Sequence, residues 1–369
     1  MKTEPPKRPR LFAQVLAAAR EYDASDIHLI AGLPPAFRVG GEIITALNYD
    51  AIQREELFML AETLLSPAQR LRLEKERELS ISHYDQTFGR IRLSLYHRIG
   101  VPEMSIRMCN LEIKTADQLM IPKAAAELTK LTSGLILVTG PTGMGKTTTL
   151  NYMIDSINSS RRCKIVTIED PVEFEHPHRK SIITQIEVGT DTLTFAHCLR
   201  HVLRLDPDVI CIGEMRDLDT IETALTAAET GHLVIATLHT PNTSSTVERI
   251  VSAFEGSRQP QIIYQLASSL QGVIAQRLVP TIDRSSRVLA SEVLIATDAV
   301  RNIIRENRAH QIYNVISTSK HDSHMHTMES SLMDLYLGGK ISYETALLNA
   351  SNTDYMKHLL HGQTRKTET

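Results

Sequence analysis

Residues 140–147 form a glycine-rich loop that constrains the fold of this chain more strongly than any other segment. The residues just before it, 135–139, are Leu-Ile-Leu-Val-Thr and are typical of a buried strand, and the residues from Thr148 onward are typical of a helix. Glycine lets the backbone curl so that several N–H groups converge on one anion, and a helix N-terminus adds partial positive charge. The spacing Gly-x4-Gly-Lys-Thr therefore predicts a strand–loop–helix unit that binds a nucleoside triphosphate.

Two side chains of this loop have distinct chemical tasks. Lys146 can reach the β- and γ-phosphates, and the hydroxyl of Thr147 is a suitable ligand for Mg²⁺. The predicted ligands are therefore ATP and Mg²⁺. The residues expected to hold the nucleotide are Gly140, Pro141, Thr142, Gly143, Met144, Gly145, Lys146, Thr147 and Thr148.

The composition excludes several other classes of protein. The 40 lysines and arginines nearly balance the 43 aspartates and glutamates, which argues against a dominant surface for nucleic acid. The four cysteines are scattered without a Cys-x-x-Cys pair, so we expect reduced thiols and neither a zinc site nor a disulfide framework. Because the chain has no run of about 18 apolar residues, we expect a cytoplasmic protein that does not span a membrane.

The pattern of the chain changes along its length. Residues 1–10 are rich in Pro, Lys and Arg and are predicted to form a mobile tail. Residues 11–112 mix helices with alternating segments, which predicts a small α+β domain with an antiparallel sheet. Residues 113–133 are expected to link it to a second domain, residues 134–295, where strands and helices alternate as in a parallel sheet. Residues 296–369 are predicted to be helical.

Within these regions, periodicity predicts the individual elements. Helices are expected over residues 11–22, 54–64, 67–75, 194–205, 219–230, 298–306, 311–317, 328–337 and 343–350. Strands are expected over residues 27–30, 36–39, 79–83, 90–96, 102–108, 135–139, 164–168, 209–212, 233–237 and 288–294.

Polar side chains follow three of the predicted parallel strands. Glu214 follows one strand and His239 follows another, while an acidic segment with Glu169, Asp170 and Glu173 follows a third. The carboxyl ends of parallel strands meet at one edge of a sheet, where the triphosphate loop also lies. Because hydrolysis needs a carboxylate near Mg²⁺ and the attacking water, these residues are candidates for catalysis. The acidic residues also have a simpler interpretation as solvated strand-end or turn residues, and the alternative for His239 is a hydrogen bond to a neighbouring backbone group.

A histidine-rich segment is a weaker candidate for a metal site. His321, His324 and His326 are closely spaced, but they lie in a polar loop between predicted helices. The loop context favours an ordinary solvated segment.

Several motifs occur in the order found in one family of motors. Residues 167–174, 212–217 and 230–240 resemble the Asp box, Walker B motif and His box of the secretion and type IV pilus ATPase superfamily. Residues 24–29 and 299–306 resemble, more narrowly, its pilus retraction ATPases (PilT-type). The resemblance covers residues 24–351, which is nearly the whole chain.

The resemblance implies an α/β fold, with a RecA-like P-loop ATPase domain preceded by a PAS-like α+β domain and followed by a helical C-terminal region. It also implies a ring-shaped homohexamer at the cytoplasmic face of the inner membrane, peripheral to the bilayer. Its partner there would be an inner-membrane pilus platform protein, and no nucleic acid is expected.

The same resemblance assigns roles to particular residues. Glu214 would polarise the attacking water, Glu173 would act at the Mg²⁺ and γ-phosphate side, and His239 would sense the γ-phosphate. Arg92 and Arg107 would contact the γ-phosphate, because arginine binds phosphate oxygens in pairs; the alternative is that both are solvated strand residues. The residues implied to hold Mg²⁺, partly through water, are Thr147, Glu173 and Glu214.

The predicted function is therefore ATP hydrolysis that drives retraction of a type IV pilus. The chain lacks the tetracysteine module usual in assembly ATPases, and Met215 and residues 300–306 also favour retraction. Met144 in place of the usual Ser and the His-rich residues 321–326 depart from the family pattern. The alternatives are an assembly or secretion ATPase and, from other classes, a RecA-like nucleic-acid motor or a nucleotide-dependent scaffold.

Overall fold

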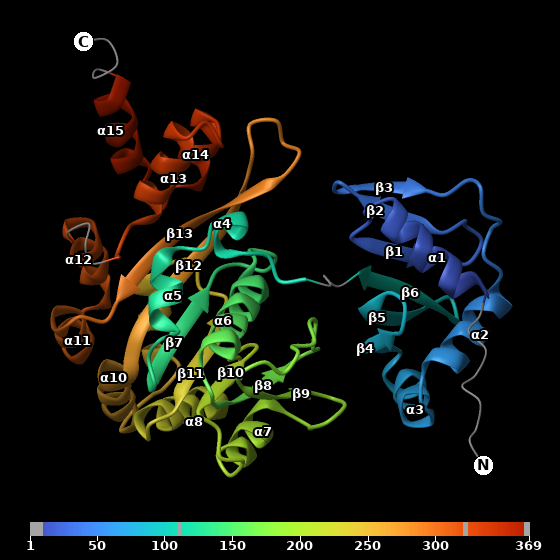
Figure 1. Cartoon of the computed structure of the whole chain (residues 1–369), viewed down its shortest axis with the longest axis horizontal. Coiled ribbons are helices and arrows are strands. Elements are labelled where there is room, and N and C mark those ends of the chain that lie inside the picture. The colour runs from blue at the N-terminus through green and yellow to red at the C-terminus, as the bar shows by residue number, and fades with distance from the viewer. Residues whose placement is uncertain (1–9, 109–111, 320–323, 365–369) are drawn as a thin grey trace. The chain divides into compact units, whose positions relative to one another are not determined.

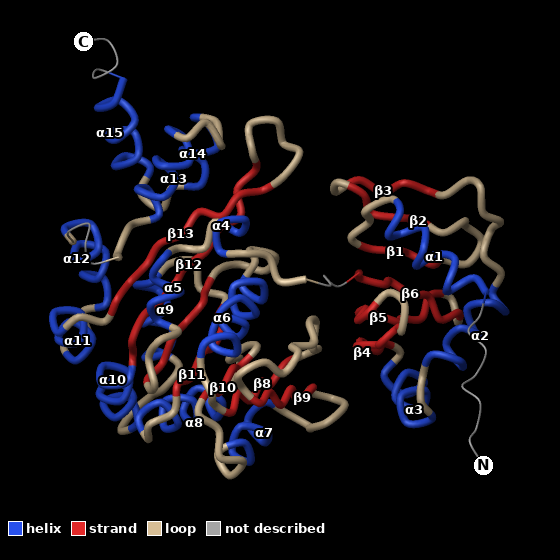
Figure 2. The backbone as a smooth tube through the Cα atoms, in the orientation of Figure 1, coloured by secondary structure: helices blue, strands red, loops and turns tan. Residues whose placement is uncertain are grey.

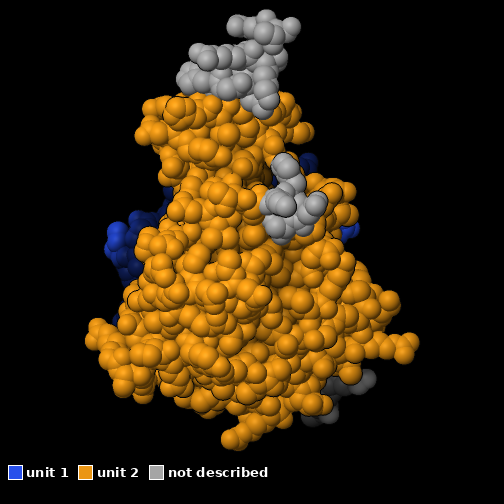
Figure 3. All heavy atoms as spheres, turned by 90° about the vertical axis from the view of Figure 1, so that its left-hand side faces the viewer, with its two compact units in different colours: residues 1–112, 171–175 blue, residues 113–170, 176–369 orange. Residues whose placement is uncertain are grey.

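The computed structural model describes residues 10–108, 112–319 and 324–364, which belong to two compact units (Figures 1, 2 and 3). The first unit consists of residues 1–112 together with 171–175, and the second consists of residues 113–170 and 176–369. The C-terminal helices thus belong to the same unit as the parallel sheet. The predicted mobile tail lies outside the described residues, except for Arg10, which begins the first helix.

The described part of the first unit is an antiparallel six-stranded sheet with three helices, as the predicted α+β pattern requires. The strand order is β3-β2-β1-β6-β5-β4. The elements are α1 (Arg10–Glu21), β1 (Asp26–Leu29), β2 (Ala36–Val39), β3 (Glu42–Thr45), α2 (Arg54–Leu64), α3 (Pro67–Glu76), β4 (Glu78–Asp85), β5 (Gly89–Arg98) and β6 (Val101–Met108).

One face of this sheet supplies the core of the first unit. Along β5 the residues Ile91, Leu93 and Leu95 are buried and alternate with more exposed ones, as expected for a strand covered on one side. Phe12 of α1 is buried in the same hydrophobic cluster. Ser66 caps α3 by accepting a hydrogen bond from the backbone N–H of Gln69, and the proline at the first position of α3 fits its helical φ angle.

The second unit contains, among the described residues, a seven-stranded sheet in the order β13-β12-β7-β11-β10-β8-β9. Its first elements are α4 (Ala116–Leu119), α5 (Lys123–Leu128), β7 (Gly134–Thr139), α6 (Lys146–Ser160), β8 (Lys164–Glu169), β9 (Ile182–Glu187), α7 (Phe195–Val202), β10 (Val209–Ile212) and α8 (Leu218–Glu229). The chain continues through β11 (Leu233–Leu238), α9 (Thr243–Ser252), α10 (Arg258–Ser269), β12 (Leu270–Pro280) and β13 (Arg287–Ile295). It ends with α11 (Asp298–Arg305), the 3₁₀ turn η1 (Ala309–Gln311), α12 (Ile312–Thr318), α13 (Met328–Leu337), α14 (Tyr343–Asn349) and α15 (Thr353–Thr364).

The strands of this sheet run parallel except for the edge strand β13, which pairs antiparallel with β12. Every residue of β7, β10 and β11 is buried, because helices cover both faces. On one face Ile136 and Cys211 pack with α5 and α6, and on the other Leu137 and Ile210 pack with α7 to α10 (Figure 1). This is the layered arrangement of a RecA-like α/β domain, as predicted. A separate cluster packs α13, α14 and α15 against β12 and β13.

The predicted elements are present with ends that shift by a few residues, but several other elements were not predicted. All residues of β3 are exposed, so no apolar alternation marks that strand. The strands β9 and β12 and the helices α9 and α10 were not predicted either, while α15 lies in residues 296–369, which were predicted to be helical without a separate helix named there. The segment 113–133, expected to be a plain connection, contains the short helices α4 and α5.

Candidate nucleotide-binding site

The glycine-rich loop leaves the carboxyl end of β7 and leads directly into α6. Gly140 has φ +142°, and a Cβ atom there would lie 2.5 Å from the carbonyl oxygen of Gln276 on β12, so only glycine fits. Gly145 caps α6 in the left-handed region at φ +81°. Met144, which departs from the family pattern, has a local role: its Sδ accepts a hydrogen bond from the backbone N–H of Leu278 at 3.2 Å. The loop is therefore held against β12 on both sides of its turn.

Lys146 directs its ammonium group back into this loop. The Nζ atom donates to the carbonyl oxygens of Gly140 at 2.7 Å and Pro141 at 3.0 Å, and it lies 3.1 Å from Nδ1 of His239. Burial lowers the pKa of Lys146, and the charge of Glu214 acts in the opposite direction. A buried ammonium group next to backbone carbonyls is well placed to compensate for phosphate charge.

His239 connects Lys146 to Glu214. Its Nε2 lies 2.7 Å from Oε1 of Glu214, while its Nδ1 faces Lys146. An ammonium group can only donate, so Nδ1 is the acceptor and the ring hydrogen sits on Nε2, which donates to the carboxylate. The hydroxyl of Thr142 also lies 3.5 Å from Nδ1. Three of the residues predicted from sequence thus form one hydrogen-bonded chain.

The register of the parallel strands explains this meeting. Thr139 of β7 pairs with Leu238 of β11, so the glycine-rich loop and His239 leave the sheet at the same level. Ile212 of β10 pairs with Ala236 of β11, and the chain reaches Glu214 two residues later. Side chains from separate parts of the sequence therefore gather at one edge of the sheet.

Arg216 also belongs to this group, although it was not among the site residues predicted from the sequence. Its Nη2 lies 2.8 Å from Oε2 of Glu214, and its Nη1 lies 3.9 Å from Oδ2 of Asp170. The hydrogen bond to Glu214 raises the pKa of Arg216. Its position two residues after Glu214 was the available signal, because both residues lie in the turn between β10 and α8.

The remaining candidates of the second unit have different surroundings. Glu169 is buried and accepts hydrogen bonds from Thr167 at 2.6 Å and Gln185 at 3.0 Å, so its carboxylate is engaged within the sheet. Thr147 and Thr148 lie in the first turn of α6, where Thr147 is half-buried and Thr148 exposed.

Glu173, Arg92 and Arg107 belong to the first unit. The two arginines are direct cross-strand partners on β5 and β6, so their side chains lie on the same face of the sheet. Two like charges in this position repel each other, and only Arg107 has a described ion pair, to Oδ1 of Asp26 at 2.8 Å. Asp26 therefore already offsets part of the charge of Arg107, and a further anion would offset that of Arg92.

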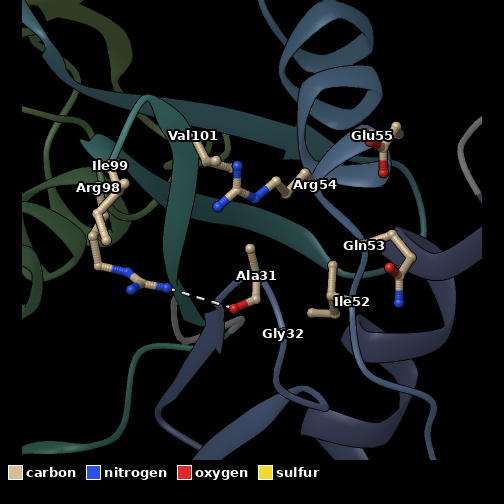
Figure 4. Close-up of a pocket in the computed structure, with 9 residues that line it drawn as sticks. All are labelled: Ala31, Gly32, Ile52, Gln53, Arg54, Glu55, Arg98, Ile99 and Val101. Carbon is tan, nitrogen blue, oxygen red and sulfur yellow. Dashed lines mark hydrogen bonds between the residues drawn. The ribbon is translucent and has the colours of Figure 1, made fainter.

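The first unit also contains a pocket of about 350 Å³ at the end of β5 and the start of α2 (Figure 4). Arg54 and Arg98 reach toward it, and Arg98 pairs with the buried Glu103 at 2.7 Å. No residue predicted for the site lines this pocket.

The histidine-rich segment is only partly described. His321 lies outside the described residues, His324 is exposed, and His326 lies 3.0 Å through its Nε2 from the hydroxyl of Ser291. Within the described ranges no group of three or more His, Cys, Asp or Glu side chains is arranged to hold a metal ion. Nor is any described helix long and apolar enough to cross a membrane.

The parallel sheet, the glycine-rich loop and the convergence of Lys146, His239 and Glu214 define a P-loop ATPase with a RecA-like core. A model of the family described as "Type II/IV secretion system protein" matches residues 6–357, so the chain belongs to that family.

Similar proteins extend over nearly the whole chain. The "Type IV pilus retractation ATPase PilT" of Pseudomonas aeruginosa is 39% identical over 335 residues, which cover 91% of this chain and 96% of that protein. A "Twitching motility protein" of Neisseria gonorrhoeae is 40% identical, with 89% and 87% covered. The crystal structure of the pilus retraction motor PilT with bound ADP has a TM-score of 0.87 and 42% identity, covering 94% of this chain and 98% of that one.

Proposed function

We propose that this chain is a motor ATPase that hydrolyses ATP to drive retraction of a type IV pilus. The observation that carries the proposal is the contact of His239 with both Lys146 and Glu214, which joins the phosphate loop to a carboxylate at one sheet edge. The relatives named for pilus retraction and twitching motility, similar along nearly their full lengths, supply the kind of work that hydrolysis drives.

In this proposal each residue at the sheet edge has a separate task. Lys146 exchanges a carbonyl partner for phosphate oxygens, and the N–H groups of the loop bind the β-phosphate. Glu214 orients the attacking water and accepts its proton. Because Oε1 of Glu214 contacts His239 and Oε2 contacts Arg216, Arg216 must release Oε2 before this oxygen can accept the proton. His239 keeps its contact with Glu214 whether or not nucleotide is bound. When a γ-phosphate is present, His239 contacts the phosphate in place of Lys146 and so senses it.

The proposal also includes Mg²⁺. The hydroxyl of Thr147 and the carboxylates of Glu214 and Glu173 are hard oxygen donors of the kind that Mg²⁺ prefers, partly through water. Bound there, Mg²⁺ supplies charge neutralisation for the phosphate oxygens. Arg92 and Arg107 are assigned to the γ-phosphate, since an anion between them removes the repulsion of this cross-strand pair.

At the level of the assembly, we propose a homohexamer that works at the cytoplasmic face of the inner membrane on a pilus platform protein. Residues 11–112 serve as the N-terminal domain, residues 113–133 as the link, residues 134–295 as the motor domain and residues 296–369 as its helical extension. Closure of the N-terminal domain on a motor domain, driven by ATP, would displace the platform protein.

The test is Glu214→Gln, which keeps the shape of the side chain but removes its basicity. ATP turnover should fall by at least about 100-fold while nucleotide affinity stays within about threefold. The matched control is Glu255→Gln, an exposed acid in the loop between α9 and α10, which should leave turnover unchanged. Turnover retained by Glu214→Gln would contradict the assignment of this carboxylate.

The cellular function is tested in a strain without the gene. Surplus pili with no twitching, restored by the wild-type gene but not by Glu214→Gln, support retraction. Cells without pili would instead support an assembly or secretion ATPase. Strong stimulation of ATP turnover by DNA or RNA would indicate a nucleic-acid motor, and nucleotide binding without turnover in the wild-type protein would indicate a scaffold.

A further inference from the structure

Two buried glutamates lie behind the site, outside the machinery described above. Glu292 of β13 is 2% exposed and Glu329 of α13 is 0% exposed. Neither has a lysine, arginine or histidine partner in an ion pair among the described residues. Burial of two carboxyl groups without a cation is unfavourable, and apolar residues of similar size would fit a core more easily. The contacts of the two side chains therefore call for an explanation beyond packing.

Glu292 fixes the start of α9. Its Oε1 accepts hydrogen bonds from the backbone N–H of Thr243 at 2.8 Å and from the hydroxyl of Thr243 at 2.7 Å. Thr243 is the first residue of α9, is fully buried, and follows His239 by four positions. Glu292 thus holds one end of the short segment that carries His239.

The same segment is tied to the strand of the glycine-rich loop. The hydroxyls of Thr240 and Thr246 lie 2.6 Å apart, and the hydroxyl of Thr246 lies 3.5 Å from that of Thr139, the residue directly before Gly140. A shift of α9 relative to the sheet would therefore move His239 relative to Lys146.

Glu329 fixes three C-terminal helices. Its Oε2 accepts a hydrogen bond from the hydroxyl of Tyr313 on α12 at 3.1 Å, and its Oε1 accepts one from the backbone N–H of Asn352 at 2.6 Å. Asn352 in turn caps α15 through the backbone N–H of Tyr355. One buried carboxyl group on α13 thus holds α12 and the start of α15.

The two glutamates are adjacent. Val293 pairs with His326 across an antiparallel bridge, and the hydroxyl of Ser331 on α13 accepts a hydrogen bond from the backbone N–H of Ser291, so β13 and α13 lie side by side (Figure 1). Burial and the charge of Glu329 raise the pKa of Glu292.

We propose that Glu292 and Glu329 link the His239 segment to the C-terminal helices, with Glu292 as a positioning residue for His239. Through this link a load on α12, α13 or α15 changes the rate of hydrolysis, and nucleotide binding changes the C-terminal helices in return. The inference rests on the proposed role of His239 in ATP hydrolysis, and it adds a mechanical input to that role.

Steady-state kinetics of full-length variants test the positioning role. Glu292→Leu and Thr243→Val remove the acceptor and one donor of the link, and each should lower kcat by about tenfold with KM within about twofold. Glu292→Gln keeps a carbonyl acceptor for Thr243 and should restore most of kcat. The matched control is Glu248→Gln, because Glu248 is an exposed acid on α9, the helix that begins with Thr243.

Tyr313→Phe tests the distant half of the link even if Glu292→Leu does not fold. It removes only the hydroxyl that contacts Glu329, and it should lower kcat by about threefold with KM unchanged. Its effect should be absent in the background of Thr243→Val, since both variants interrupt one path.

Hydrogen–deuterium exchange with a non-hydrolysable ATP analogue gives a readout that does not depend on turnover. In the wild-type protein the analogue should slow exchange in residues 312–318 and 328–337 as well as in residues 239–246. In Tyr313→Phe and Glu292→Leu the analogue should slow exchange only in residues 239–246. Folded variants with wild-type kcat, or an unchanged response of the C-terminal helices, would overturn the link while leaving ATP hydrolysis intact. A wild-type protein that does not hydrolyse ATP would instead overturn the proposed function.

Discussion

The two sheets of this protein present their charged groups in different ways. In the parallel sheet β7, β10 and β11 are buried along their whole length, so Glu214 and His239 can only follow the strand ends. In the antiparallel sheet of the first unit, Arg92 and Arg107 belong to the strands β5 and β6 themselves and project from one face of the sheet. A sheet covered on both faces leaves only its edge for chemistry, whereas a sheet covered on one face can use the other. The site groups of the parallel sheet are paired with one another, while the two arginines are like charges on paired strands, of which Arg107 contacts Asp26.

Lys146→Ala should have the largest effect on the site at the carboxyl ends of the parallel strands. It removes the buried ammonium group that faces His239 and the loop carbonyls, and nucleotide affinity should fall by about 1,000-fold, or about 4 kcal/mol. Titration with a fluorescent ATP analogue measures the change. Lys180→Ala, at an exposed position of the same unit, serves as control. Near-normal affinity of Lys146→Ala would mean that this loop does not hold the phosphates.

Arg92→Gln sharpens the comparison, because it should move activity and stability in opposite directions. Turnover should fall by about 30-fold, or about 2 kcal/mol, if this side chain contacts the γ-phosphate. Stability against urea should rise by about 0.5 kcal/mol, since a like-charge cross-strand pair disappears. Arg54→Gln, which alters the pocket of Figure 4, should change neither quantity. Turnover that survives Arg92→Gln would leave this residue as a solvated strand residue.

Glu292→Gln tests a smaller effect, on the pH dependence of stability. Glu292 lies on β13, the edge strand that runs antiparallel to the rest of the seven-stranded sheet. Burial and the neighbouring Glu329 raise the pKa of Glu292, so the folded protein favours its protonated form more than the unfolded chain does. The protonated Glu292 therefore contributes fully to the free energy of unfolding below the ordinary carboxyl pKa of about 4.3. This contribution is lost as pH rises through the raised pKa of Glu292 in the folded protein. Gln does not ionise, so the variant should match the wild-type protein in acid and gain relative stability toward pH 8.

Urea unfolding of the Glu292→Gln and wild-type proteins at several pH values measures that difference directly. Glu329 on α13 and Tyr313 on α12 face the group, and burial and Glu329 raise the pKa of Tyr313, so this hydroxyl stays protonated throughout the range. An advantage of Glu292→Gln that shrinks as pH rises would contradict the prediction.

Local patterns explain why much of the fold was predictable. The buried run 135–139, the glycines after it and the helical period that follows each depend on residues close together in the sequence. The alternation in β5 and the capping of α3 are equally local. By contrast, β3 has no buried residue, and its pairing with β2 is decided by the sheet rather than by its own pattern.

The sequence by itself determined the loop, several of the parallel strands and the residue types that follow their carboxyl ends. Only the tertiary structure decided which of these groups touch. The register of β7, β10 and β11 joins Lys146, His239 and Glu214, while Glu169 turns inward to Gln185. The pairing of Arg92 with Arg107 and the burial of Glu292 beside Glu329 depend on strands and helices distant in the chain. Local periodicity fixes which side of an element is apolar, but contacts between elements follow from how those sides pack together.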